Sequence, residues 1–271
     1  MLAPCFLVFG CGCLEIGLST LFCLGDPFPR MLERLTDFDV RCVEVVDEGL
    51  HSLSQKRVNA FRRIARDSGL EFTVHAPFAD INIASPNPVL RRVILKRLEK
   101  SLTYARELES RQWVFHSGWK SGVSEFYPNL DWQTNLRSVR SLLAVAKKLG
   151  VEIAIENTPE PSSFLIKSMR DIALFYSELG NDDLGITFDG GHANTTKEIF
   201  GFIDKFADKI VHVHISDNEG KYDQHKGIGY GKIDWKAVAK ALKDINFRGI
   251  VVCESVDHVL ESIETMREIF V

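Results

Sequence analysis

Imidazole and carboxylate side chains are concentrated in one short stretch of the sequence, HVHISDNEGKYDQHKGIGYG, residues 212–231. His214, Asp223 and His225 lie in or directly behind the apolar run KIVHVHIS (209–216). Neutral imidazole and carboxylate together suit Zn²⁺, Mn²⁺, Fe²⁺ or Co²⁺, whereas Mg²⁺ and Ca²⁺ prefer sites made only of oxygen ligands. The stretch therefore predicts part of a metal site, whose remaining ligands must come from elsewhere in the chain.

The same kinds of side chain end most of the other short apolar runs. Packed together without cations, such groups would place repelling charge in a partly desolvated space. Their number exceeds what one ion accepts, so two or three ions with a bridging Glu156 would use them all. The sequence thus predicts one to three divalent ions, Zn²⁺ or Mn²⁺, with the ligands His75, His116, Glu156, Asp189, His192, His214, Asp223, His225 and Glu254.

His212 is a separate case, because it lies two residues before His214. Alternate residues of a strand point to the same side, so His212 faces the same way one layer deeper. We expect it to support a ligand or to pack in the core, and not to bind the ion itself.

The elements that position these residues follow from the hydrophobic periodicity. Short β-branched or aromatic runs alternate with longer amphipathic stretches, which is typical of β–α units. The predicted strands are 14–19, 40–46, 71–76, 112–117, 151–157, 184–189, 209–216 and 249–255. The predicted helices are about 28–36, 54–68, 87–109, 132–149, 168–179, 196–207, 234–244 and 257–270.

Eight strands alternating with eight helices predict an α/β fold, a (β/α)8 TIM barrel, as a single domain over residues 14–271. An open doubly wound sheet is the alternative, but its glycine-rich phosphate loop is missing after the first strand. The active site of such a barrel lies at the carboxyl ends of the strands, where the predicted ligands fall. Residues 1–13 are expected to be an N-terminal extension, or the product of a start codon placed too early.

Composition limits the class of protein. The net charge of −4 argues against binding nucleic acid by bulk electrostatics. The apolar start is short and interrupted by Glu15, so no membrane span is expected. The six cysteines show no paired-knuckle spacing, which favours reduced thiols and a cytoplasmic location.

Several motifs occur in order between residues 14 and 270: VHAPFADINIASPN, FHSG, IENTP, FDGGHAN, HVHISDN, DQHKGIGYG and CES. Together they resemble the xylose-isomerase-like barrel superfamily, which includes sugar-phosphate isomerases and epimerases and the abasic-site nuclease endonuclease IV. Resemblance to endonuclease IV implies three zinc ions held by all nine ligands. Resemblance to ketose 3-epimerases such as D-tagatose 3-epimerase implies one ion held by Glu156, Asp189, His214 and Glu254, with the two glutamates moving the proton.

The ligand set favours the nuclease branch, whereas the rest of the chain favours the sugar enzymes. Phe78 stands where the nuclease family usually has tyrosine, the rim loops are short, and no basic stripe is evident. We therefore expect a metal-dependent isomerase or epimerase of a sugar or sugar phosphate, with Glu156 and Glu254 as acid and base. The alternative is a zinc-dependent phosphodiesterase acting on abasic duplex DNA.

Substrate contacts are expected from two places. The loop SGWKSGVSEFYPNLDW (117–132) carries Trp119, Phe126 and Tyr127, which suit stacking on a sugar ring or, alternatively, contact in a homodimer. Lys120 in the same loop suits a substrate phosphate. Glu44, near the end of the second strand, is expected to face the rim and contact substrate, or to form a salt bridge to a neighbouring strand.

Overall fold

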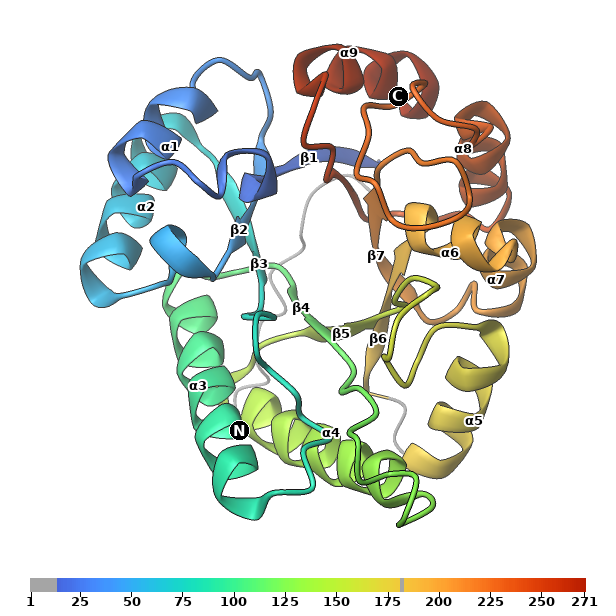
Figure 1. The fold of residues 1–271 in the computed structure, drawn as a ribbon. Coiled ribbons are helices and arrows are strands. Elements are labelled where there is room, and N and C mark those ends of the chain that lie inside the picture. Colours follow the sequence, from blue (N-terminus) through green and yellow to red (C-terminus); the bar gives the residue numbers. More distant parts are fainter. Residues whose placement is uncertain (1–13, 181–182) are drawn as a thin grey trace, which may run out of the picture.

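The computed structural model describes residues 14–180 and 183–271. Within them eight parallel strands close into a barrel in chain order, with the first strand paired to the last. The helices form a ring around the strands (Figure 1). This confirms the predicted (β/α)8 barrel. The predicted extension, residues 1–13, lies outside the described residues.

The element bounds agree with most of the predicted ranges. The strands are β1 (Glu15–Ser19), β2 (Cys42–Val46), β3 (Glu71–His75), β4 (Trp113–His116), β5 (Ile153–Glu156), β6 (Gly185–Asp189), β7 (Ile210–Ile215) and β8 (Ile250–Cys253). The α-helices are α1 (Phe28–Leu35), α2 (Gln55–Ser68), α3 (Pro88–Glu107), α4 (Leu130–Leu149), α5 (Met169–Leu179), α6 (Gly190–Thr196), α7 (Ile199–Lys205), α8 (Trp235–Asp244) and α9 (Val259–Phe270). Two short 3-10 helices, η1 (Thr20–Cys23) and η2 (Gly49–His51), follow β1 and β2.

Local sequence signals set the ends of the long helices. The Ser54 side chain accepts a hydrogen bond from the backbone N–H of Arg57 and begins α2. Asn87 caps α3 in the same way, with Pro88 in its first turn. Gly150 ends α4 with a left-handed φ of 66°, a conformation that glycine adopts without steric penalty.

The structure corrects one predicted element. The sequence predicts one helix over 196–207, whereas α6 begins directly at the end of β6 and α7 follows it. Asp189 caps α6, because its Oδ1 accepts a hydrogen bond of 2.6 Å from the backbone N–H of His192. The two glycines that open α6 have poor helix propensity, which hides the helix from a periodicity argument.

The inside of the barrel is layered. Cys42, Ile250 and Val252 form a small apolar cluster separate from the main core, against Gly17. The main apolar core fills the space between strands and helices. Between the small cluster and the carboxyl ends of the strands lie buried polar side chains, which form a polar layer: Ser19, Glu44, Thr73, Thr187 and His212.

The described cysteines are buried thiols. Cys23, Cys42 and Cys253 are free, and burial raises the pKa of Cys253 to about 11. Such thiols stay protonated and unreactive near neutral pH. No helix in the described ranges combines the length and apolarity that crossing a membrane requires. The cytoplasmic location stays a prediction.

Candidate metal centre

The nine predicted ligands converge at the carboxyl end of the barrel. They come from strands β3 to β8 and from the segments directly behind them. The described residues contain four groups in which one ligand atom per residue lies within 4.8 Å of the others; the nine predicted ligands make up three of them, and Glu44, His212 and His214 make up the fourth. The three groups of predicted ligands are His75, His116 and Glu156; Glu156, Asp189, His214 and Glu254; and His192, Asp223 and His225.

Glu156 is the central side chain of the cluster. Its Oε2 lies 3.1 Å from His116 Nε2 and 3.4 Å from His75 Nε2. Its Oε1 lies 3.3 Å from His214 Nδ1 and 3.4 Å from His192 Nδ1. A carboxylate shared in this way between two ligand groups is placed to bridge two ions.

Backbone carbonyls orient the imidazoles. The Nδ1–H of His75 donates to Ala76 O at 2.8 Å, and the Nδ1–H of His225 donates to Glu254 O at 3.0 Å. Each ring therefore presents Nε2 to the cluster. His225 Nε2 lies 2.7 Å from Asp223 Oδ2. Fixing the ring through its other nitrogen is the usual arrangement for a metal-binding histidine.

Unpartnered buried oxygens indicate that the cluster fits cations. Asp189 Oδ2 and Asp223 Oδ1 are buried and have no hydrogen-bond partner. Buried polar atoms nearly always have a hydrogen-bond partner. A cation bound in the cluster would be the missing partner of these two oxygens. The mixture of imidazole and carboxylate suits Zn²⁺ or Mn²⁺. The residues present therefore fit a divalent-metal centre.

The protonation of the cluster supports the same conclusion. Burial raises the pKa of Asp189 to about 7. Burial disfavours the charged form of His192, but Asp189 and Asp223 outweigh it and raise the pKa to about 10. For His75, Glu156 likewise overcomes burial and raises the pKa to about 9. Protons on these groups thus balance the negative charge that metal ions would otherwise balance. Binding of a metal ion would release these protons.

The loop that carries Asp223 and His225 is organised by Asp217, a member of the histidine- and carboxylate-rich stretch to which the sequence assigns no role. The carboxylate of Asp217 is fully buried and accepts hydrogen bonds from the backbone N–H groups of Gly229 (3.0 Å) and Ile233 (3.2 Å) and from Trp235 Nε1 (3.2 Å). An aspartate directly after a strand, before a glycine-rich segment, is the signal that could have identified it.

Aromatic side chains form one wall beside the cluster. The Phe164 ring packs edge-on against His116 with centroids 5.5 Å apart, and Trp119 packs against Phe164 at 5.7 Å. Phe78 packs against His75 at 5.5 Å. The structure therefore brings Trp119 close to the site through Phe164, which sequence reasoning did not single out.

The other predicted substrate residues lie farther from the cluster or deeper. Phe126 and Tyr127 are 78% and 61% exposed, and within the described part of the chain neither ring stacks on a ligand. Lys120 is exposed and lines a cavity of about 860 Å³ between the loops after β4 and β5. Glu44 lies below the rim and not on it: it is fully buried and pairs with His212 and His214 across the barrel. These imidazole partners lie on β7, which does not pair with β2, so they are not the neighbouring-strand partner that the sequence suggested.

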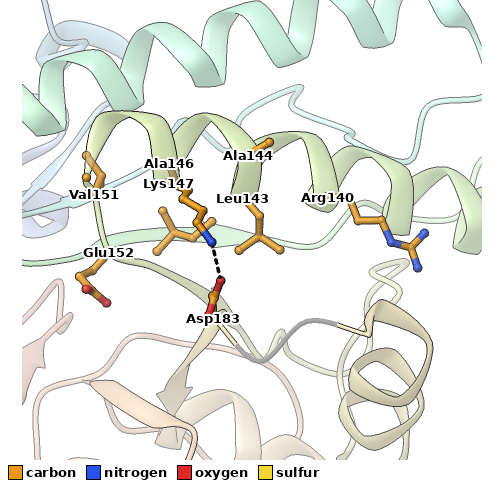
Figure 2. A pocket seen from close by; sticks show the side chains of 10 residues that line it. Arg140, Leu143, Ala144, Ala146, Lys147, Val151, Glu152 and Asp183 are labelled. Carbon is orange, nitrogen blue, oxygen red and sulfur yellow. Dashed lines mark ion pairs between the residues drawn. The ribbon is translucent and has the colours of Figure 1, made fainter.

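A second cavity, of about 700 Å³, lies at the opposite end of the barrel (Figure 2). Its lining comes from α4, from residues just before β5 and from Asp183 just before β6. Lys147 Nζ lies 3.7 Å from Asp183 Oδ2 across it. None of the nine predicted ligands lines this cavity.

The tight packing of α6 gives a testable expectation for Gly191→Ala. A Cβ on Gly191 would lie 2.9 Å from the backbone oxygen of Ser216, which is too close. We expect the helix to be displaced, the free energy of unfolding to fall by about 1–3 kcal/mol, and the affinity contributed by His192 to fall with it. Denaturant unfolding and zinc titration measure both. In the control Gly201→Ala on α7, the added methyl meets only the flexible Met169 side chain, and stability should be kept; equal losses in both variants would contradict the packing argument.

The chain is similar to a known protein family and to individual proteins of several organisms. The family model described as "Xylose isomerase-like TIM barrel" matches residues 32–269. An uncharacterised protein of Methanocaldococcus jannaschii is 30% identical over 265 residues, covering 94% of this chain and 89% of the relative. D-psicose 3-epimerase of Ruminiclostridium cellulolyticum is 25% identical and covers 82% of this chain and 76% of the relative.

Two further similar proteins correspond to the two alternatives, an endonuclease IV-like nuclease and a ketose 3-epimerase-like sugar enzyme. A probable endonuclease 4 of Aquifex aeolicus is 26% identical over 204 residues, covering 69% of this chain and 71% of the relative. Among solved structures, a D-tagatose 3-epimerase-like protein superposes with a TM-score of 0.88 at 28% identity, covering 94% of this chain and 96% of that one.

Proposed function

Because the chain belongs to the xylose isomerase-like TIM barrel family, we propose that it is a divalent-metal-dependent isomerase or epimerase of a sugar or sugar phosphate. The observation that carries this proposal is the four-residue group Glu156, Asp189, His214 and Glu254, gathered at the carboxyl end of the barrel. Epimerases among the similar proteins support the same choice. The proposed ion is Zn²⁺ or Mn²⁺.

The two glutamates of this group are the proposed acid and base. Their carboxylates approach the same atom, with Glu156 Oε1 at 3.3 Å and Glu254 Oε2 at 3.4 Å from His214 Nδ1. A bound divalent ion would polarise the substrate carbonyl, which acidifies the neighbouring C–H bond. One carboxylate then removes that proton, and the other carboxyl group returns a proton to the opposite face of the carbon.

Glu156 is well suited to remain ionised. Burial opposes its charge, but His214 and His116 outweigh burial and hold its pKa well below the usual range. The aromatic side chains of Trp119, Phe164 and Phe78 beside the cluster support a small substrate with a ring face.

A second candidate, hydrolysis of a phosphodiester in abasic DNA, is favoured by a separate observation. Two further groups, one with His75 and His116 and one with His192, Asp223 and His225, flank the first group. Glu156 lies between four imidazoles, which favours bridging over proton transfer. A multinuclear centre of this kind supports activation of water and neutralisation of phosphate charge.

The variant His225→Ala separates the two candidates. His225 belongs only to the third group, so an epimerase that uses one ion should keep its turnover within about 10-fold, whereas a three-ion hydrolase should lose roughly 100-fold or more. Turnover is measured on a panel of ketoses and sugar phosphates and as nicking of an abasic duplex, with Zn²⁺ or Mn²⁺ added. His258→Ala, an exposed histidine outside the cluster, is the control. Wild-type protein that binds metal but acts on neither substrate class would contradict both candidates.

A further inference from the structure

The third group of predicted ligands is assembled from two separate segments. His192 lies on the short helix α6, whereas Asp223 and His225 lie in the loop that follows β7. His192 Nε2 lies 3.3 Å and His225 Nε2 lies 2.7 Å from the same oxygen, Asp223 Oδ2. An ion can use all three residues only if the loop is held against α6 at a fixed position, because a metal site tolerates deviations of only about 0.2 Å in ligand distance.

The loop is held by Asp217, which is fully buried just behind β7. Its backbone pairs with that of Lys226, the residue after His225, through two hydrogen bonds of 2.9 Å. Four donors also converge on its carboxylate, and they are the backbone N–H groups of Asn218 (2.9 Å), Ile233 (3.2 Å) and Gly229 (3.0 Å) and the Nε1–H of Trp235 (3.2 Å). One residue therefore fixes the loop on both sides of the segment that carries the two ligands.

The next residue, Asn218, connects the same loop to α6 and is also fully buried. Its Nδ2 donates to the backbone oxygen of Gly191 at 2.8 Å, and its Oδ1 accepts a hydrogen bond of 2.8 Å from Asn194 Nδ2. These two partners lie on either side of His192 in the sequence of α6. The ring of Trp235 also lies against the first residue of that helix.

We propose that Asp217 and Asn218 together form a clamp, a pair of positioning residues that holds the loop against α6 and gives the third group the geometry to bind an ion. The proposal rests on the metal centre of the proposed function. Within the described residues, neither side chain forms a hydrogen bond or ion pair with a predicted ligand side chain, so the clamp acts through the positions of the two segments. Loss of residues that orient metal ligands from behind typically lowers metal affinity about 10- to 100-fold.

The test is the zinc affinity and stoichiometry of Asp217→Asn and Asn218→Asp, measured by competition with a chromogenic chelator. The first substitution replaces one acceptor oxygen by an amide nitrogen, so two of the four donors lose their acceptor. The second removes the donor to the Gly191 oxygen. The ion that matters is the one that His225→Ala removes, because His225 belongs only to the third group. We expect both variants to weaken that ion about 10- to 100-fold and to keep the other ions at wild-type affinity.

The matched control is Asp47→Asn. Asp47 is also a fully buried aspartate directly behind a strand, and it fixes its own loop by accepting hydrogen bonds from the backbone N–H of Leu53 at 2.6 Å and from Arg97 at 2.6 and 2.9 Å. We expect its thermal midpoint to fall as in Asp217→Asn while every zinc affinity is kept. An equal loss of third-group affinity in the control would reduce the effect to general destabilisation, and wild-type affinity in both clamp variants would overturn the proposal.

Amide hydrogen exchange of the unsubstituted protein gives a second measurement, which does not require any variant to fold. The N–H groups of Gly229 and Ile233 donate to the Asp217 carboxylate, so we expect both to be protected in the metal-free protein, with less than about a 10-fold change when zinc is added. Protection that develops only with zinc would mean that the ion organises the loop, and the clamp would be rejected.

The same titrations separate failure of the clamp from failure of the proposed function. A wild-type protein that binds no divalent ion would contradict the proposed function itself. A wild-type protein that binds zinc, but no ion that His225→Ala removes, would contradict only the clamp.

Discussion

Replacement of Glu156 by glutamine is expected to lower turnover at least about 1,000-fold, whichever of the two substrate classes the enzyme uses. The carboxylate contacts four imidazoles and belongs to two of the four groups that could hold an ion. A neutral amide of the same size removes the negative charge that balances the cations, and it cannot act as a base. Steady-state assays and zinc titration of the same preparation measure the loss of turnover and of bound metal.

The control is Glu152→Gln, an exposed glutamate just before the same strand. It should behave as wild type in both assays. If Glu156→Gln kept full metal binding and turnover within 10-fold of wild type, the centre of the site would lie elsewhere.

Removal of divalent ions is expected to lower the thermal midpoint by about 10 °C. A ligand present at 1,000 times its dissociation constant stabilises the folded state by about 4 kcal/mol, and a domain of this size shifts by roughly 2–4 °C per kcal/mol. Without ions, burial raises the pKa of Asp189 to about 7, and the Glu254 carboxylate has the His214 imidazole 3.4 Å away as its partner. Calorimetry of chelator-treated protein, before and after zinc is restored, measures the shift.

The variant Glu156→Gln supplies the internal control for that experiment, because its midpoint should respond much less to the chelator. A midpoint that is the same with and without zinc in the wild-type protein would mean that the cluster does not bind ions in the folded state.

The barrel was predictable because its strands are short apolar runs separated by well-capped helices. Gly150 and Pro88 mark helix ends in the sequence and at the same places in the structure. The region behind β6 was not predictable from periodicity. There a glycine pair weakens the helical signal, and α6 forms because Asp189 caps it and small residues allow close approach to Ser216.

The set of candidate ligands could be predicted from the sequence, because parallel strands bring their carboxyl ends to one rim. A residue's place in its strand therefore predicts its place in space. The depth of a side chain along the barrel axis was harder to predict from the sequence. Glu44 and His75 both lie near the ends of their strands, yet pairing aligns Glu44 with Thr73 and His75 with Val46. This register puts Glu44 one layer lower, and a sequence pattern contains no register. The loop residues Phe126 and Tyr127 were equally out of reach, because no periodicity fixes where a loop side chain points.

The pairing of β1 with β8 also decides when the site can form during translation. The ribosome delivers the first strand about 230 residues before the last, and β1 has an unpaired edge until β8 emerges. Glu254 follows β8, and its backbone carbonyl anchors the His225 ring. A nascent chain that ends before β8 therefore carries eight of the nine ligands on an open, aggregation-prone sheet. Of the three groups formed by the predicted ligands, the four-residue group is the one that needs Glu254, so it is completed only after the last strand has been made.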